Sequence, residues 1–458
     1  MRKILIASLG AGDKKREYKI GNYNINGRIY TEKYIAAALD KEFKMDKIFY
    51  IGTLGSMWEN IYIDYCKGNS VNIDENYKSE LELKMLDFLD MTNENKKNVS
   101  FDFMNLDRIK DISKGKINPI LTRYGLDDKE NFENFNQILK IIDELQDGDE
   151  IYLDITHSFR SNAFWIFLVM NYINDVADKN INIKYISYGM FEAKEKNEKG
   201  IEVVPVVNLK LFLDLTKWIK GAYSFKNFGN STLIRELLDE SGNEKIKNKL
   251  ENFSNSININ YVSSIKENIN YFKRNLEIID KIDGPGKLII PKIVREFLEH
   301  FNGTEEEYDI LLRLAKWHYK EERYAMVYTN LIEAIKSYII KTLDIYSDEE
   351  EEYFILDKKI SYAVKKIEAK LRNNTQKKFN ELNAFFKTYK RCKQSRNNIA
   401  HSGNVKKNII MKEKTESVAN DIRGLKDHIL ICEKIFKQNK LLQEFCSYYM
   451  INYEQNEN

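Results

Sequence analysis

The segment DEIYLDITHSFRS, residues 149–161, decides the fold of the N-terminal half of this 458-residue chain. Its first part is apolar and predicts a buried strand, and its second part is a polar turn. NAFWIFLVMNYIND (162–175) follows and predicts a buried helix, and NIKYISYGMFEA (182–193) predicts another strand. Strands separated by helical segments indicate a parallel α/β sheet.

The same alternation extends over residues 1–213. KILIASL (3–9) and KIFYIGTLGSMW (47–58) predict strands that run into glycine-containing turns, whereas TEKYIAAALDKEF (31–43) and NFENFNQILKIIDEL (131–145) predict helices. After VVPVVNLKLFLDL (203–215) the periodicity becomes almost entirely helical. We therefore predict an α/β domain over 1–213 and an all-α domain over 214–458.

Within the helical half, residues 238–310 are interpreted as linker or insertion helices. The charged, asparagine-rich part of this stretch, residues 238–280, is expected to form solvated helices or an insertion, and its role is left open. DGPGK (283–287) is the one clear break and predicts a turn between helices.

Composition indicates a soluble globular protein, with 43% hydrophobic and 31% charged residues. The 72 basic and 70 acidic residues give a net charge of +2, so any attraction for nucleic acid must come from local clustering. The four cysteines form no CxxC pair, which predicts neither a zinc site nor a disulfide framework and fits a reducing cytoplasm. The sequence holds no apolar run of about 20 residues, so no membrane span is expected.

Three polar turns are expected at the carboxyl edge of the sheet, where ligands of open parallel sheets bind. They are LGAG (9–12), GTLGS (52–56) and THSFR (156–160). Glycines permit close approach of a phosphate, and a following helix N-terminus favours an anion. Each turn has a structural alternative, since a glycine after a strand is often only a turn and a Thr-His pair can cap a helix. Lys15 stands where a third glycine would complete GxGxxG, which disfavours a nicotinamide or flavin oxidoreductase.

YLDITHSFRS (152–161), together with YGLDDKENFENF (124–135), YIGTLGSMW (50–58) and YGMFEAK (188–194), resembles the CARF domain of CRISPR-associated proteins. This Rossmann-like sensor occurs in the accessory ribonucleases of type III systems. The resemblance implies a homodimer, with higher oligomers left open, that binds one cyclic oligoadenylate across its two-fold axis. It favours cyclic tetra-adenylate and leaves cyclic hexa-adenylate open. The positions that match ligand-contacting loops are Leu9, Gly10, Ala11, Gly12, Thr53, Ser56, Thr156, His157, Ser158 and Arg160.

The helical half raises a different question, because four of the five histidines stand five residues after an arginine. The spacing alone therefore has little specificity. His318 adjoins Trp317 and Tyr319 and is interpreted as a packed histidine. His300 precedes FNG and is expected to interact with a helix C-terminus, which favours a cation. His428 lies on a continuing helix and is also interpreted as structural.

Arg396 and His401 differ in context, because they lie in SRNNIAHSGN (395–404), where a polar break follows the helix. Five residues advance a helix by about 7.5 Å, so both side chains can reach one cleft near a helix end. RNNIAH resembles the HEPN nuclease motif, Arg-polar-x-x-x-His, with Asn397 at the polar position. A helical domain behind a CARF domain is the arrangement that this family implies, with two motifs meeting across the dimer in one composite site.

The residue types fit cleavage of RNA through the ribose 2′-OH, which needs neither a metal nor a cofactor. His401 titrates near neutral pH and can transfer protons. Arg396 stays charged and can stabilise the phosphoryl oxygens, and Asn397 is assigned to orientation. The basic run KTYKRCKQSR (387–396) either guides an RNA backbone or forms a solvated helix face.

The resemblance thus implies a metal-independent endoribonuclease of type III antiviral defence that cleaves single-stranded RNA when cyclic oligoadenylate binds. Slow cleavage of the ligand by the sensor domain, through Ser158 or His157, is a further hypothesis. The alternative is a non-enzymatic sensor of cyclic oligoadenylate that regulates through nucleic-acid binding. Such a sensor would bind duplex without cleaving it and would not need Arg396 and His401 together.

Overall fold

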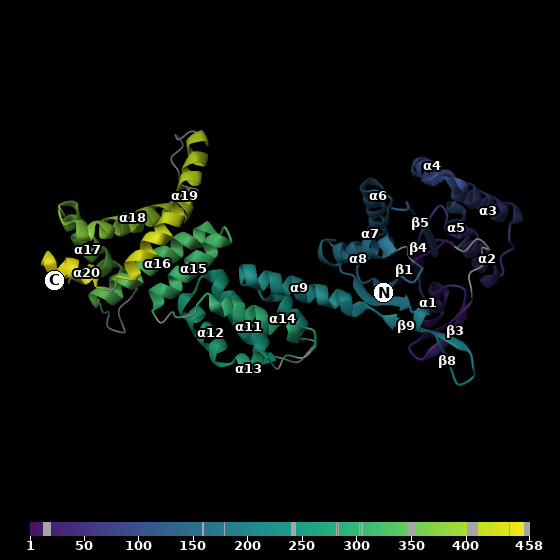
Figure 1. Ribbon diagram of the computed structural model, residues 1–458, viewed down its shortest axis with the longest axis horizontal. Helices are drawn as coiled ribbons and strands as arrows, with labels where there is room; N and C mark the ends of the chain where they lie inside the picture. The colour runs from purple at the N-terminus through teal and green to yellow at the C-terminus, as the bar shows by residue number, and fades with distance from the viewer. Residues whose placement is uncertain are drawn as a thin grey trace. The chain divides into compact units, whose positions relative to one another are not determined.

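The computed structural model describes residues 1–11, 20–157, 160–177, 179–239, 244–280, 282, 284–301, 303, 306–345, 353–400, 411–438 and 440–452 (Figure 1). The side chains of 160–162, 239, 278, 353–354 and 411–421 lie outside this description. The chain divides into two compact units, Met1–Leu215 and Thr216–Asn458. The division falls within helix α9 (Lys210–Phe228).

Unit 1 is built on a mixed sheet whose strands occur in the order β3-β2-β9-β7-β6-β1-β4-β5, with β8 paired to β9. The strands are β1 (Lys3–Ser8), β2 (Gly21–Ile25), β3 (Arg28–Glu32), β4 (Lys47–Thr53), β5 (Ile117–Thr122), β6 (Glu150–Asp154), β7 (Asn182–Gly189), β8 (Glu195–Lys196) and β9 (Glu202–Asn208).

The centre of the sheet, β5-β4-β1-β6-β7, is parallel, as the alternation of strands and helices predicted. From β1 the chain builds outward through β4 to β5, then returns to the other side of β1 and continues through β6 to β7. The direction of winding therefore reverses between β1 and β6. In open α/β sheets this switch point opens a crevice at the carboxyl ends of the strands, and ligands bind there.

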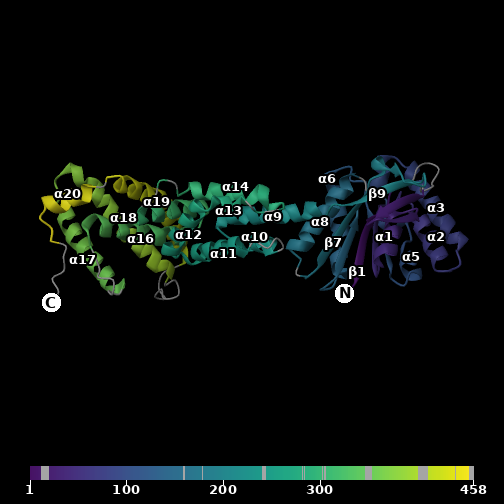
Figure 2. The same cartoon turned by 90° about the horizontal axis from the view of Figure 1, so that it is seen from below.

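Helices cover both faces of the sheet (Figure 2). Because side chains alternate along a strand, Ile4 and Ile6 of β1 pack against α6–α8, whereas Leu5 and Ala7 pack toward α1–α5. The helices are α1 (Ile35–Phe43), α2 (Trp58–Gly68), α3 (Glu75–Asp90), α4 (Asn93–Asn98), α5 (Asp107–Ile112), α6 (Asp128–Leu139), α7 (Ile141–Glu144) and α8 (Arg160–Asp175), with the 3₁₀ turns η1 (Phe101–Phe103) and η2 (Phe191–Ala193).

The antiparallel part of the sheet was not predicted. β2 and β3 form a hairpin closed by Asn26 and Gly27, which both have positive φ (52° and 85°). β9 then pairs parallel to β2 and antiparallel to β7. An Asn-Gly pair between alternating strands is a strong signal for such a hairpin, so the sequence did contain the information. The fold is an α/β domain followed by a helical unit, as predicted, but its sheet is mixed.

Unit 2 consists of helices in the part of the chain that the structure describes. They are α10 (Thr232–Asp239), α11 (Glu244–Ile259), α12 (Val262–Arg274), α13 (Leu276–Ile279), α14 (Gly286–Glu299), α15 (Glu307–Lys320), α16 (Tyr324–Leu343), α17 (Tyr353–Arg372), α18 (Asn380–Ala400), α19 (Met411–Phe436) and α20 (Leu441–Tyr448), with η3 (Lys377–Phe379) before α18.

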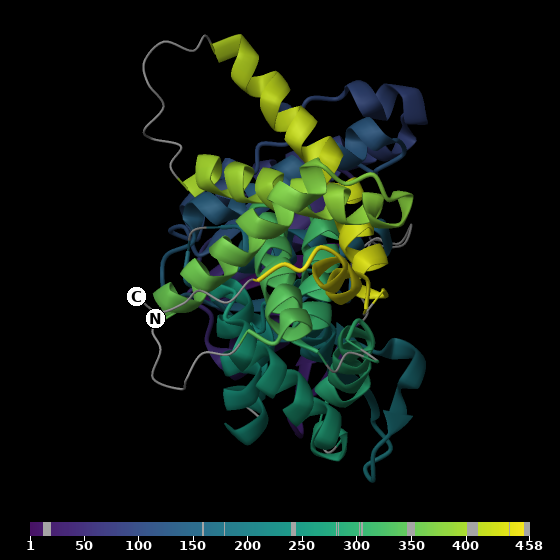
Figure 3. The ribbon, with the colours of Figure 1, turned by 90° about the vertical axis from the view of Figure 1, so that its left-hand side faces the viewer.

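Two hydrophobic cores hold unit 2 together, and α15 contributes to both. Its Leu314 and Trp317 join the core of α9–α14, whereas Leu311 and Leu312 join the core of α16–α20. In the second core α16 packs against α15, α18 and α19. Figure 3 shows the yellow α19 lying next to the green α18.

The described parts of the stretch 238–280, residues 238–239 and 244–280, form helices that share a core rather than helices surrounded by solvent. Ile246, Leu250, Phe253 and Ile257 recur every three or four residues on α11 and are buried. The ring of Phe253 lies 5.1 Å from that of Phe297 on α14. The many charged and Asn residues occupy the other positions of these helices, which is why composition alone suggested a solvated segment.

Candidate functional site

Asp154, the last residue of β6, lies beside the switch point of the sheet and is completely buried. Its Oδ1 accepts hydrogen bonds from the Thr156 amide (3.3 Å), the Thr156 hydroxyl (2.6 Å) and the Ser187 hydroxyl (3.1 Å). The Thr156 hydroxyl accepts in turn from the amide of Gly189 at 2.8 Å. One carboxylate oxygen thus joins the ends of β6 and β7 and fixes the turn that begins at Thr156.

Burial controls ionisation in this turn. It raises the pKa of Asp154 to about 7, although the hydrogen bonds from Thr156 and Ser187 act in the opposite direction. Asp154 Oδ2 has no hydrogen-bond partner within the described residues, so it is the oxygen that can hold the proton. Burial also lowers the pKa of His157 to about 4, so this imidazole is neutral at pH 7.

The turns after β1 and β4 are joined by the hydroxyl of Ser56. It donates to the carbonyl of Leu9 (2.8 Å) and accepts from the amide of Thr53 (3.0 Å). Both Thr53 and Ser56 are buried. A Cβ at Gly52 would lie 2.8 Å from Ser56 Oγ and 2.9 Å from the Trp58 ring, so the first glycine of this turn is required by close packing.

The structure therefore brings the described parts of the three predicted turns to one edge of the sheet. The residues of these turns differ in how much of each is exposed. Leu9 is buried, Gly10 is half-buried and Ala11 is exposed. Gly12 and Ser158 lie outside the described residues, as does the side chain of Arg160, the first residue of α8. Direct contact of any of them with a ligand stays a prediction.

Two further polar groups at this edge were not among the predicted residues. The Ser187 hydroxyl, on β7, bonds to both Asp154 and the Leu153 carbonyl. The Ser8 hydroxyl, at the end of β1, is buried and has no hydrogen-bond partner within the described residues. A serine at the end of an apolar strand, next to a predicted polar turn, is the signal that could have identified both.

In unit 2, Arg396 and Asn397 lie partly buried near the C-terminal end of α18, with Asn397 in its last turn. The Asp357 carboxylate of α17 lies close enough to influence this turn. Its pKa is held below the usual value mainly by a hydrogen bond from Lys336, and the charges of Lys393 and Arg396 contribute. His401 lies outside the described residues, so the structure does not place the second half of the motif.

Lys336 is a buried cation of α16 near this motif. Its ammonium lies 2.7 Å from Asp357 and 3.3 Å from Glu333, and only 7% of its side chain is exposed. A buried lysine stays charged only when carboxylates pair with it, so these contacts hold a fixed charge cluster between α16 and α17.

The other Arg–His pairs behave as structural elements. His318 is buried against Trp317, with ring centroids 5.0 Å apart, and burial lowers its pKa to about 3. His428 is buried and bonds to the Thr388 hydroxyl at 3.2 Å. His300 is the C-cap residue of α14, as expected, but burial and nearby Lys320 lower its pKa. The expected interaction of a cationic His300 with the helix end is therefore disfavoured.

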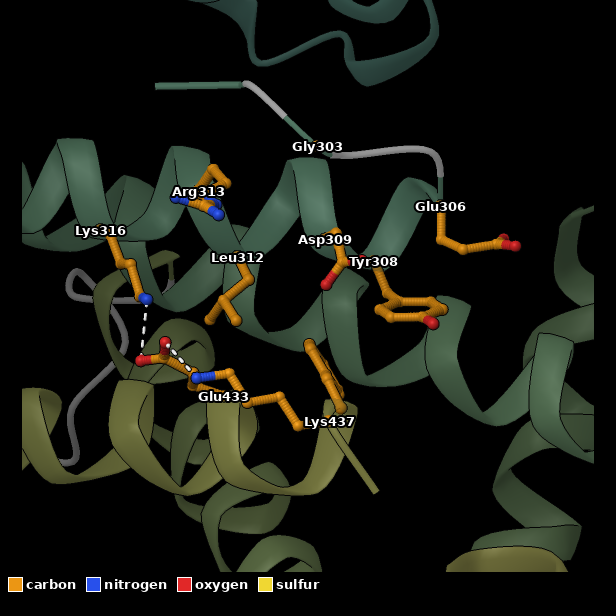
Figure 4. A pocket seen from close by; sticks show the side chains of 10 residues that line it. Gly303, Glu306, Tyr308, Asp309, Leu312, Arg313, Lys316, Glu433 and Lys437 are labelled. Carbon is orange, nitrogen blue, oxygen red and sulfur yellow. Dashed lines mark hydrogen bonds and ion pairs between the residues drawn. The ribbon is translucent and has the colours of Figure 1, made fainter. Parts of the chain in front are cut away.

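Arg313 lines a cavity of about 410 Å³ between α15 and α19 (Figure 4). Glu433 pairs there with Lys316 (2.8 Å) and with Lys437 (3.1 Å). His318 is not among the residues that line this cavity, so Arg313 and His318 do not meet in it. The paired charges join α15 to α19 and leave little net charge for binding a phosphate.

Two negative findings apply to the described residues. No helix among them is long and apolar enough to cross a membrane. No group of three or more His, Cys, Asp or Glu side chains is arranged there to hold a metal ion.

Comparisons with known proteins agree with this architecture. The family model "CRISPR system endoribonuclease Csx1, CARF domain" matches residues 4–192. The model "CRISPR-associated protein MJ1674, second domain" matches residues 214–305. CRISPR-associated protein MJ1674 of Methanocaldococcus jannaschii is 31% identical over 354 residues, which are 73% of this chain and 53% of that protein. The chain thus spans about half the length of this curated relative.

A solved structure of Enterococcus italicus Csm6 bound to cyclic hexa-2′-fluoro-hexa-dAMP aligns with 97% of this chain and 99% of that chain. The identity is 12% and the TM-score is 0.37, which is too low to establish a shared fold.

The sheet, its switch point and the match over residues 4–192 define a CRISPR-associated protein with an N-terminal CARF domain. The match of the following segment and the similarity to MJ1674 extend the relationship to CRISPR-associated proteins into the helical unit. This confirms the CARF-containing CRISPR-associated family that the N-terminal motifs indicated and agrees with the CARF–HEPN organisation, whose nuclease motif stays a prediction.

Proposed function

We propose that this protein is a metal-independent endoribonuclease that cleaves single-stranded RNA, and that cyclic oligoadenylate bound between the CARF domains of two copies activates it. The observation that carries the nuclease proposal is the position of Arg396 and Asn397. They lie at the C-terminal end of a helix, where the charge of Arg396 interacts with that of Asp357, and His401 stands four residues beyond Asn397.

The proposed chemistry uses the 2′-OH of the ribose as nucleophile. This oxygen forms a bond to the adjacent phosphorus while the bond to O5′ breaks, which gives a 2′,3′-cyclic phosphate and a 5′-hydroxyl. The proton leaves the 2′-OH, and O5′ gains one. His401 transfers one of these protons, Arg396 stabilises charge on the non-bridging oxygens, and Asn397 orients the phosphate.

The switch point between β1 and β6 supports the sensor part of the proposal. It gathers the turns after β1, β4 and β6, and α8 begins three residues after His157, the last described residue of the turn that follows β6. A helix N-terminus favours phosphate, and Arg160 is the first residue of this helix. These features suit the phosphates of a cyclic oligonucleotide, with cyclic tetra-adenylate favoured by family resemblance and cyclic hexa-adenylate as the alternative.

An exposed apolar stripe on α8 supports the homodimer. Phe164, Leu168 and Tyr172, followed by Val176 just beyond the helix, recur every four residues, and 74%, 51%, 39% and 62% of these residues are exposed. The opposite side of α8 packs on the sheet, so the helix is apolar on two sides, which is typical of a helix buried on both. A second copy would cover the stripe by an isologous contact next to the ligand turns, and such symmetry suits a ring-shaped ligand.

Activation requires that the ligand bind more tightly to the arrangement in which the two HEPN motifs are aligned. Reciprocally, RNA bound at the aligned motifs should strengthen ligand binding by the same factor. The difference in ligand-binding free energy between the two arrangements thus drives the alignment of the two HEPN motifs.

The test is cleavage of labelled single-stranded RNA in EDTA, with and without each cyclic oligoadenylate. The natural protein is compared with His401→Ala and with His300→Ala, a matched control from another Arg–His pair. We expect cleavage with one ring size only, lost in His401→Ala and kept in His300→Ala. Cleavage that persists in His401→Ala would exclude RNNIAH as the active site. If no ligand elicits cleavage and the protein binds duplex, the non-enzymatic sensor becomes the function.

The same reactions test slow degradation of the activator by the CARF domain. His157 is neutral at pH 7 and can accept a proton, and Ser158 is the neighbouring nucleophile. The ring should disappear slowly in His401→Ala, which lacks ribonuclease activity, and persist when His157→Ala is added. Unchanged rings in His401→Ala would exclude this activity.

A further inference from the structure

Phe191 is an exposed aromatic residue at the edge of unit 1 where the ligand is expected. It opens the 3₁₀ turn η2, two residues after Gly189, the last residue of β7. Because β7 runs parallel to β6, η2 leaves the sheet at the same carboxyl edge as the turn that holds Thr156 and His157. The sequence motifs did not single out Phe191 as a ligand-contacting residue.

The position of Phe191 is unusual among the exposed aromatic side chains that the structure describes in unit 1. The others lie on helices: Phe132 on α6, Phe164 and Tyr172 on α8, and Phe212 on α9. Within this described part of the unit, Phe191 is thus the one exposed aromatic side chain that follows a strand at the carboxyl edge of the sheet.

Two neighbouring rings hold the side chain of Phe191. Its ring centroid lies 5.9 Å from that of Tyr23, which meets it edge-on at 90°, and 6.2 Å from that of His157. Tyr23 is completely buried on β2, whereas 36% of Phe191 stays exposed. Edge-on contacts of this kind are favourable in protein cores, so the ring is ordered on one side and accessible on another.

Backbone hydrogen bonds fix the turn that carries the ring. The Met190 amide donates to the Pro205 carbonyl of β9 at 2.9 Å, and the Ala193 amide donates to the Met190 carbonyl at 3.0 Å. The Gly189 amide donates to the Thr156 hydroxyl, which joins the start of η2 to the turn after β6. Because turn and ring are already positioned, a group that stacks on the ring pays little conformational entropy.

We propose that Phe191 stacks on an adenine base of the cyclic oligoadenylate and thereby gives the CARF domain part of its preference for adenine. The proposal rests on the ligand proposed above and deepens it. The polar turns suit the phosphates, which every cyclic oligonucleotide has, whereas Phe191 contacts a base.

The chemistry of the ring favours a purine. Bases bind aromatic side chains through their π faces, and differences among bases come from the strength of stacking. The two fused rings of adenine cover more of a phenyl face than the single ring of uracil does. A ring of adenylates should therefore gain more from Phe191 than a ring of uridylates with the same phosphates and riboses.

The experiment measures binding of two rings to the full-length protein by calorimetric titration. One is the cyclic tetra- or hexa-adenylate that the natural protein binds more tightly, and the other is the cyclic oligouridylate of the same size. The variants are Phe191→Ala and Phe191→Trp. Met190→Ala is the matched control, because it removes the neighbouring apolar side chain, which is 39% exposed.

The natural protein should bind the adenylate ring more tightly than the uridylate ring. Phe191→Ala should lose about 10- to 100-fold in affinity for the adenylate ring and less for the uridylate ring, so that the preference for adenine falls by at least about 3-fold. Phe191→Trp, which offers a larger aromatic face, should retain affinity and preference. Met190→Ala should change the affinity for either ring by less than about 3-fold.

Equal losses for the two rings in Phe191→Ala would mean that Phe191 supports only the shape of the turn, and would overturn the stacking. The same conclusion follows if Phe191→Trp binds no better than Phe191→Ala. Sedimentation velocity on these samples tests whether a second copy covers Phe191 instead. Loss of the homodimer together with affinity for both rings would assign Phe191 to that interface and exclude stacking.

The outcomes also separate this proposal from the function on which it rests. If Phe191→Ala binds the adenylate ring as the natural protein does, the stacking is wrong and the sensor stands. If the natural protein binds neither ring, the sensor is excluded and the stacking with it. If Phe191→Ala loses the preference for adenine but no ring elicits RNA cleavage from the natural protein, the stacking stands and the nuclease proposal fails.

Discussion

The hydroxyl of Thr156 donates to Asp154 Oδ1 across 2.6 Å and accepts from the amide of Gly189 across 2.8 Å. This single hydroxyl therefore links the buried carboxylate at the end of β6 to the end of the neighbouring strand β7. Both strand ends lie at the edge where the phosphate ligand is expected, so the shape of the site depends on the two hydrogen bonds of this hydroxyl.

Thr156→Val should weaken binding of cyclic oligoadenylate by at least about 10-fold, because valine keeps the shape of threonine and leaves the Gly189 amide and Asp154 without this partner. The variant should also lose about 1–3 kcal/mol of stability. Calorimetric titration with each ring, together with thermal unfolding, measures both effects.

Thr388→Val is the matched control for this prediction. Thr388 is buried on α18 of unit 2 and its hydroxyl pairs with His428 Nδ1 at 3.2 Å, outside the sheet that carries the ligand turns. It should lose stability and keep ligand affinity. Similar affinities for the two variants would contradict a specific role of Thr156.

Asp154→Asn should remove a dependence of stability on pH. The folded-state pKa of about 7 lies above the ordinary value of 3.8, so the folded protein holds a proton that the unfolded chain releases. Stability from this group is present below pH 4, falls as the pH rises toward 7, and is level above that. The total is up to about 4 kcal/mol.

Hydrogen exchange of the β6 amides at pH 5 and pH 8 measures this effect without requiring two-state unfolding of both units. Protection in the natural protein should fall between these pH values beyond the intrinsic change in exchange rate. In Asp154→Asn, which resembles the protonated acid, it should change much less. Parallel behaviour of the two proteins would mean that Asp154 titrates normally.

The parallel centre of the sheet was predictable because its strands are buried on both faces and form short apolar runs. The hairpin β2–β3 was missed although Asn26-Gly27 indicates it, because its residues GNYNI and RIYTE are polar at alternate positions. Local patterns of this kind are present in the sequence and can be recovered from it.

Contacts between distant residues could not be predicted in the same way. Ser56 was expected to contact a ligand, yet its hydroxyl bonds to the Leu9 carbonyl, 47 residues away. The charges of Asp357 on α17 and Arg396 on α18 interact. No local sequence pattern predicts that these two helices pack together. The motifs located the turns and the end of α18, but tertiary packing decides which hydroxyls and charges remain available.

Leu168→Asp should weaken the proposed homodimer by at least about 30-fold, because a carboxylate would face its own copy across an apolar isologous contact. Sedimentation velocity across a concentration series measures the change. Leu288→Asp is the control, since Leu288 is exposed on α14 of unit 2 and lies outside the stripe. A monomeric natural protein, or equal effects of both substitutions, would exclude the α8 stripe as the interface.

Lys336 and Asp357 should show strong coupling in a double-mutant cycle. Lys336→Met leaves the Asp357 carboxylate without its main partner and should destabilise unit 2 by about 2–4 kcal/mol. Asp357→Asn should be costly as well, whereas the double variant should recover part of the loss, with a coupling energy of at least about 1 kcal/mol. Because the pKa of Asp357 is depressed, its contribution is present above the ordinary pKa and is lost as the pH falls through the folded value.

Denaturant unfolding at pH 7 and pH 4 followed in unit 2 tests the cycle, and RNA cleavage by the same variants separates two roles. If Asp357 only pairs with Lys336, Asp357→Asn loses stability and activity falls only with the folded fraction. If Asp357→Asn keeps stability but loses cleavage with an unchanged pH profile, Asp357 instead positions Arg396 for the phosphate. In that case the pair Lys336–Asp357 and the nuclease motif form one charge network. Lys336 partly neutralises the Asp357 carboxylate and thereby limits its attraction for Arg396.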